Sequence, residues 1–251
     1  MIMVRRLVSV IAFDMRAVLR DQFMYLLLLI IGVLYGLFAG VGMNREALGV
    51  AGLTQWIPYV LILSIITNPS SFGLLFGFLL IEEVETKVRA ALMTTPVPPL
   101  ALLAMRTPLT IVVLTATALL LVASLNAAWG RPVALAFHQW LALAVSAAFI
   151  GAAVMISIST LASDRVAALA LGKFYSGLTA PPALLYLAPP DAWWRPLFLF
   201  FPTTPIVKAY DSFRAGASAA AWAWLAFGVL YVGVLTAFAA RRYLRKSYAI
   251  A

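Results

Sequence analysis

Residues 107–126 read TPLTIVVLTATALLLVASLN, a stretch without a single charged side chain. A helix of about 20 such residues crosses the hydrocarbon core of a bilayer, which is about 30 Å thick. Five other stretches are predominantly apolar over a similar length: 23–41, 56–81, 139–161, 166–188 and 219–240. The sequence therefore predicts an all-α, polytopic membrane protein with six transmembrane helices, forming a single domain over residues 1–251.

The composition supports a lipid environment. Hydrophobic residues make up 64% of the 251 positions and charged residues 11%, whereas ordinary soluble domains have about 25% charged residues. So few charges cannot cover a water-facing surface, which makes membrane lipid the expected surroundings. The net charge of +9 does not predict a nucleic-acid partner, because the basic residues sit in short connectors and not on one continuous patch.

The basic residues instead predict the orientation in the membrane. With the N-terminus inside, thirteen lysines and arginines fall on the cytoplasmic side and five fall outside. The five are Arg45, Arg131, Arg195, Lys208 and Arg214. The positive-inside rule then places both termini in the cytoplasm, and we expect a multi-pass protein of a bacterial cytoplasmic membrane.

Residues 3–20 precede the first apolar stretch and have helical amphipathicity. Four arginines in this segment share an arc of roughly 100°, and apolar side chains fill the opposite side. The pattern predicts a helix that lies flat on the cytoplasmic leaflet. An irregular basic leader is the alternative.

The connector after the second apolar stretch carries the most specific pattern. Residues 82–99 read EEVETKVRAALMTTPVPP, in which three acids are followed by a helix-compatible segment and a proline-rich turn. The segment predicts a short charged helix in the cytoplasm that suits docking onto a partner. The alternative is an ordinary charged loop that closes a helical hairpin.

This connector resembles the E-K-E-x-G-T-x-x-x-L-x-x-T-P-V signature of type-2 ABC exporter permeases, which have six spans and a separately encoded ATPase. Lys87-Val88 replaces the Gly-Thr of that signature, while the amphipathic leader and the Phe-Pro-Thr-Thr-Pro stretch at 201–205 also fit. In that family the segment is a coupling helix that sits in a cleft on the ATPase. The resemblance implies an ATPase-coupling role for Glu82, Glu83, Glu85, Leu92, Thr95, Pro96 and Val97.

The resemblance also implies the cofactors and protein partners. The chain lacks a G-x-x-x-x-G-K-[ST] phosphate loop, since Gly172-Lys173 has neither the preceding glycine nor the following hydroxyl. We therefore expect no enzymatic activity in this chain and assign ATP and Mg to the partner ATPase. With no cysteine and one histidine, a metal site is not expected either. A second permease, identical or not, would complete the working unit.

Gly32, Gly36 and Gly40 repeat at four-residue spacing along the first apolar stretch. Such a stripe of small residues lets another helix approach closely. The resemblance suggests that the first and fifth spans build the seam between two permeases. Packing within the chain is the alternative.

Polar residues interrupt the second apolar stretch near its middle, at Thr67, Asn68, Pro69, Ser70 and Ser71. Polar groups are costly at this depth, and Pro69 removes a helical hydrogen bond. These residues predict either part of a substrate pathway or a kink whose polar groups bond to neighbouring helices.

Pro181-Pro182 predicts a break in the fifth stretch, and an aromatic-rich region follows up to Pro205. Aromatic residues at this depth favour anchoring at the headgroups. The resemblance adds short re-entrant helices that cap the outer end of the pathway, and so an external gate as the alternative.

Together these features predict the permease subunit of an ATP-driven exporter that moves a lipophilic drug, natural product or lipid, and less readily an oligosaccharide. Ion-coupled carriers normally place acids within their spans, yet all nine acids here lie in connectors or flanking segments. A non-transporting membrane scaffold or assembly subunit is the alternative function.

Overall fold

The computed structural model describes residues 22–86, 99–186, 189 and 191–250. The described chain is helical throughout and contains no strand, which confirms the all-α class. Its α-helices are α2 (Gln22–Met43), α3 (Ile57–Glu85), α5 (Pro99–Ala128), α6 (Phe137–Leu161), α7 (Arg165–Thr179), α8 (Thr204–Arg214) and α9 (Ser218–Ile250). Three short 3₁₀ helices are η1 (Ala51–Trp56), η2 (Pro181–Tyr186) and η3 (Arg195–Phe200).

Among the residues that the structure describes, four helical segments are long and apolar enough to cross a membrane: Ala51–Glu83, Arg106–Ala128, Phe137–Leu161 and Ser218–Arg245. They coincide with the second, third, fourth and sixth predicted stretches. The first stretch lies in α2, where the apolar part found among the described residues is Leu29–Met43. The count of six spans therefore stays a prediction.

The fifth predicted stretch is not one continuous helix. Asp164 starts α7 by accepting a hydrogen bond from the amide of Ala167 at 2.8 Å, and the helix ends at Thr179, before Pro181. Proline has no amide hydrogen to donate and disfavours helical geometry in the residue before it. The break predicted at Pro181-Pro182 is confirmed, and the stretch 166–188 is not one continuous helix, because α7 has 15 residues and is about 22 Å long. A fifth span stays a prediction.

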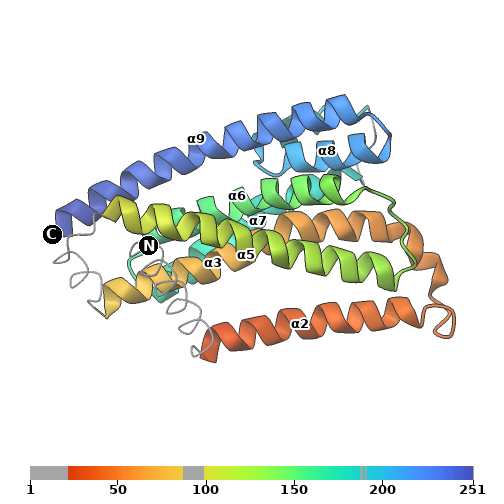
Figure 1. The fold of residues 1–251 in the computed structure, drawn as a ribbon, viewed down its shortest axis with the longest axis horizontal. Coiled ribbons are helices and arrows are strands. Elements are labelled where there is room, and N and C mark those ends of the chain that lie inside the picture. Colours follow the sequence, from red (N-terminus) through yellow and green to blue (C-terminus); the bar gives the residue numbers. More distant parts are fainter. Residues whose placement is uncertain (1–21, 87–98, 187–188, 190, 251) are drawn as a thin grey trace, which may run out of the picture.

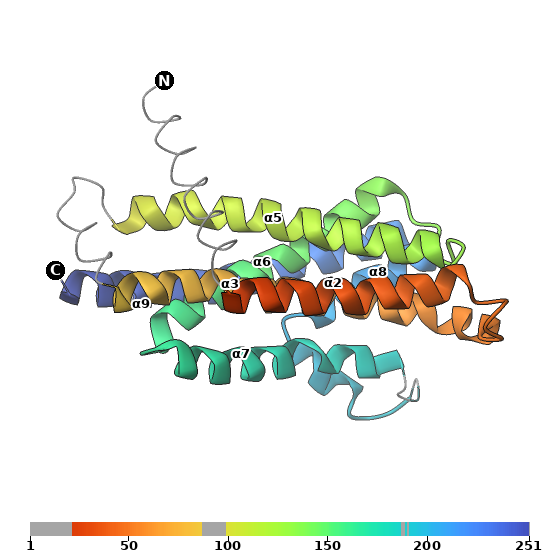
Figure 2. The same cartoon turned by 90° about the horizontal axis from the view of Figure 1, so that it is seen from below.

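The long helices lie side by side along the longest axis of the molecule (Figures 1 and 2). One end of the bundle holds the C-terminal ends of α3, α6 and α9 and the N-terminal ends of α2, α5 and α7 (Figure 1). The opposite end holds the connections after α2 and α5 and the connection between α8 and α9 (Figure 1). The chain thus alternates in direction, as the predicted topology requires.

At the centre of the bundle, α6 packs against α3, α5 and α9. The closest approach is between α3 and α6, where a Cβ added to Gly151 would run into the backbone of Pro69 and the side chain of Leu114. A Cβ added to Gly73 would likewise run into the backbone of Gly151. Backbone therefore touches backbone at this crossing, which leaves no room for a side chain.

The orientation can be tested with single cysteines, since the chain has none of its own. We expect Leu48→Cys, in the turn after α2, to react with a membrane-impermeant thiol reagent added to intact cells. Ser163→Cys, between α6 and α7, should react only after the cells are permeabilised. The opposite labelling pattern would invert the predicted topology.

Candidate functional site

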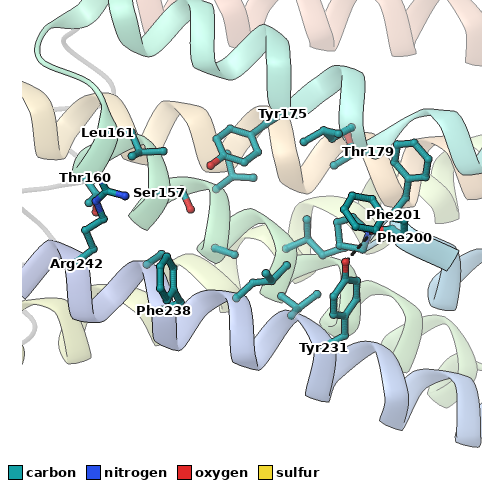
Figure 3. Close-up of a pocket in the computed structure, with 18 residues that line it drawn as sticks. Ser157, Thr160, Leu161, Tyr175, Thr179, Phe200, Phe201, Tyr231, Phe238 and Arg242 are labelled. Atoms are coloured by element: carbon teal, nitrogen blue, oxygen red, sulfur yellow. Dashed lines mark hydrogen bonds between the residues drawn. The ribbon is translucent and has the colours of Figure 1, made fainter. Parts of the chain in front are cut away.

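A cavity of about 370 Å³ lies between α6, α7, α9 and the residues that follow η3 (Figure 3). Its volume falls within the range of small-molecule sites, roughly 300–1,000 Å³. The lining residues are Ile150, Ala153, Val154, Ser157, Thr160, Leu161, Tyr175, Leu178, Thr179, Phe200, Phe201, Pro202, Tyr231, Val232, Leu235, Phe238, Ala239 and Arg242.

Helical spacing explains why three helices share this cavity. On α6 the lining positions Ala153 and Ser157 lie one turn apart, and on α9 Tyr231, Leu235 and Phe238 follow the same face. Each helix thus presents a continuous stripe to the cavity. The walls are mostly apolar and aromatic, with a few hydroxyl groups among them.

One end of the cavity is lined by the segment 200–202. The hydroxyl of Tyr231 donates a hydrogen bond to the carbonyl of Phe200 at 2.8 Å, drawn as a dashed line in Figure 3. The hydroxyl of Thr203 donates to the carbonyl of Thr179 at 2.9 Å. These bonds tie the segment to both α9 and α7, so this end of the cavity is held from two sides.

The other end of the cavity carries Arg242, the only charged residue among the described lining residues. Its side chain reaches toward Thr160 and the neighbouring Ser157 of α6 (Figure 3). None of the acidic residues that the structure describes lines the cavity. The arrangement suits a ligand with an apolar body and a polar or negative group at one end.

The polar residues predicted as a substrate pathway lie within α3, and none of them lines this cavity. Asn68 is buried, and its amide donates to the hydroxyl of Tyr35 at 2.6 Å and to the carbonyl of Ser64 at 2.8 Å. The hydroxyls of Thr67, Ser70 and Ser71 each donate to the carbonyl four residues earlier.

These hydrogen bonds bear on the two alternatives left open for the second stretch. Asn68 bonds to Tyr35 of the neighbouring helix α2, whereas the hydroxyls of Thr67, Ser70 and Ser71 bond to carbonyls of α3 itself, and Pro69 lies within α3. Thr67 and Ser71 remain partly exposed. A role for the segment in transport stays a prediction.

The predicted ATPase-coupling acids at the end of α3 form ion pairs within the chain. Glu83 and Arg106 of α5 make two contacts of 2.8 and 2.5 Å, and their side chains are only 15% and 12% exposed. Glu82 and Glu85 pair with Arg165 at the start of α7, at 3.1 and 3.4 Å. We call these five residues the charge cluster.

The charge cluster follows from helical geometry. Residues two apart on a helix point about 200° from one another, so Glu83 and Glu85 must contact different neighbours. They do, since one meets α5 and the other meets α7. The sequence did not reveal that these neighbours are arginines of the same chain.

The remaining predicted coupling residues lie outside the described residues. They are Leu92, Thr95, Pro96 and Val97. The predicted interfacial helix over residues 3–20 also lies outside them.

The glycine stripe predicted for a dimer seam lies on an open face of α2. A Cβ added to Gly32, Gly36 or Gly40 would meet no atom within 4 Å. Nothing in the described part of the chain packs on this stripe. By contrast Gly42, further along the helix, lies against the ring of Trp129.

The region after Pro181-Pro182 folds back against the bundle in short helices. Seven of the residues of α8 are buried, including Pro205 and Tyr210, and the hydroxyl of Tyr210 donates to the carbonyl of Pro58 at 2.8 Å. The hydroxyl of Tyr186 donates to the carboxyl of Asp211 at 2.9 Å, and burial raises the pKa of Asp211 above its usual value. Sequence reasoning missed α8, although Pro205 in its first turn was a signal.

A helical bundle with long apolar helices and an internal cavity lined by apolar and aromatic side chains has the architecture of a multi-pass membrane permease. The chain belongs to the Rv2686c-like family, whose model is described as "Fluoroquinolones export permease protein Rv2686c-like" and matches residues 14–240. This match confirms the resemblance to exporter permeases drawn from the connector. No curated protein and no solved structure matches the chain.

Proposed function

We propose that this chain is the membrane-spanning permease subunit of an ATP-driven exporter of lipophilic, drug-like molecules in a bacterial cytoplasmic membrane. The observation that carries the proposal is the family match over residues 14–240, since the family is described by the export of fluoroquinolones. The aromatic cavity supports it, because fluoroquinolones are flat aromatic acids that such walls suit.

The proposed source of energy is a separate ATPase that binds ATP and Mg and docks on the connector between α3 and α5. The connector resembles a coupling helix in sequence. The charge cluster supports this role, because it fastens the end of α3, from which the connector leaves, to both α5 and α7. Motion of the connector would therefore reach three helices at once.

The proposed working unit contains two permeases, with the open glycine stripe of α2 at their seam. Thr67 and Ser71, partly exposed on α3, would face the route between the two permeases, with Asn68, Pro69 and Ser70 shaping the helix behind them.

Gly36→Leu should leave the fold intact, because no atom lies near that position, and should weaken dimerisation at least tenfold by separating the helices.

Cross-linking of the purified chain in lipid nanodiscs measures this effect. Gly233→Leu on α9 is the matched control, since that position is equally open. Equal dimer yields for Gly36→Leu and Gly233→Leu would exclude the α2 stripe from the seam.

The proposed function is tested by deleting the gene for this chain and following the intrinsic fluorescence of a fluoroquinolone taken up by the cells. Deletion should raise accumulation several-fold, and reintroduction of the gene should reverse the rise. Depletion of ATP should mimic deletion, whereas a protonophore that leaves ATP intact should not. Unchanged accumulation after deletion would favour the non-transporting scaffold, and sensitivity to the protonophore alone would exclude the ATP-driven mechanism.

A further inference from the structure

The charge distribution of the cavity is one-sided. Arg242 is the single charged residue among the described residues of its lining and stands at one end. In the described part of the chain the acidic partners found in ion pairs are Glu82, Glu83 and Glu85, all of which pair with Arg106 or Arg165. Within the described residues, the positive charge of Arg242 therefore faces the cavity without a neutralising carboxylate.

The body of the cavity is built for a flat apolar group. Tyr175 of α7 and Phe238 of α9 face the space from opposite sides, and Phe200 and Phe201 line the far end (Figure 3). From Arg242 to Tyr231 the wall runs along about 16 Å of helix. A ligand anchored at Arg242 would thus lie along aromatic side chains until it met Phe200 and Phe201.

We propose that this cavity is a binding site for an aromatic carboxylic acid, with the ring system between α7 and α9 and the carboxylate at Arg242. The inference rests on the proposed function, because it identifies the class of molecule that the exporter takes. A guanidinium binds a carboxylate through two parallel N–H donors, and Thr160 and Ser157 place hydroxyl groups close by.

An anionic lipid shares the acidic group and the apolar body, but it suits the cavity less well. The end formed by residues 200–202 is tied to α9 and α7 by hydrogen bonds from Tyr231 and Thr203. A long acyl chain anchored at Arg242 would run into Phe200 and Phe201 at this end, whereas a compact ring system would not. Aromatic walls also favour rings over flexible chains, because rings stack on them.

The test is equilibrium binding to the full chain in nanodiscs of zwitterionic lipid, by titration calorimetry. The probes are a quinolone carboxylic acid without an amine substituent and its ethyl ester, which keeps the rings and removes the charge. We expect the wild-type chain to bind the acid about tenfold more tightly than the ester. Arg242→Gln should abolish this preference, and Arg241→Gln should preserve it.

Arg241 is the matched control because it is also exposed and basic but does not line the cavity. On the aromatic side, Phe238→Ala should weaken the binding of both probes several-fold, whereas Phe227→Ala, on α9 but outside the lining, should not. Both phenylalanines are largely exposed, so neither change removes a buried core residue.

Three results would overturn the proposal: no preference for the acid in the wild-type chain, equal losses for Arg242→Gln and Arg241→Gln, or unchanged binding to Phe238→Ala. Loss of acid binding in phosphatidylglycerol nanodiscs would assign the site to anionic lipid instead. These outcomes are separable from the proposed function. Normal export by cells carrying Arg242→Gln and Phe238→Ala would preserve the exporter and reject only this site.

Discussion

Arg106→Leu is expected to lower the free energy of unfolding by about 3–5 kcal/mol, because it leaves Glu83 charged and mostly buried without its partner. Thermal unfolding of the purified chain in detergent measures the loss. Replacing both residues by leucine should recover most of it, since the double change removes the uncompensated charge together with its partner.

Arg165→Leu is the control for the first prediction. Arg165 pairs with two acids, but the three side chains are 36–43% exposed, and pairs in contact with solvent contribute only about 0–1 kcal/mol. We therefore expect a small change. If Arg106→Leu and Arg165→Leu lowered the free energy of unfolding by similar amounts, burial of the Glu83–Arg106 pair would not be the reason for the loss.

Gly151→Leu is expected to cost about 3 kcal/mol or more and to prevent normal assembly of the bundle. The new side chain would have to displace the backbone of Pro69 on α3, which cannot yield as a flexible side chain would. The yield of monodisperse protein and its unfolding temperature measure the effect.

Gly233→Leu makes the same change on α9 at a position with no atom within 4 Å of the new Cβ. It should be nearly neutral, because helix propensity favours leucine over glycine. If both leucine variants behaved alike, the close crossing of α3 and α6 would not limit stability.

The sequence predicted those parts of the fold that depend on local composition. Long apolar stretches coincide with the four helices able to span a membrane, and Pro181-Pro182 marked the end of α7. The length of α7 was wrong, because average apolarity over 166–188 concealed the backbone constraint of two prolines.

The site could not be predicted in the same way, because it depends on which helices meet. Ala153, Ser157 and Phe238 look like ordinary residues of apolar helices, and only the packing of α6 beside α9 brings them to one cavity. Likewise, Gly151 does not belong to a regular repeat of glycines, so nothing in the sequence indicated that a helix packs against it. The regular repeat at Gly32, Gly36 and Gly40, in contrast, touches no other helix of the described chain.

The acids of the connector show a further limit of the pattern. The signature alone suggested that Glu83 and Glu85 act on the partner ATPase. In the structure Glu83 holds α3 to α5, so its removal should also weaken the chain itself. The two-residue spacing predicted that Glu83 and Glu85 point to different sides of the helix, but it did not predict which residues they contact.

The contacts of α7 attach this helix to α3 at two points. Its first residue, Arg165, is bound to the acids at the end of α3, and midway along it Gly172 rests against the side chain of Leu74, also on α3. Tyr175 and Thr179, further along α7, line the cavity. One wall of the cavity is therefore carried by a helix that is anchored to α3 both at its start and at its middle.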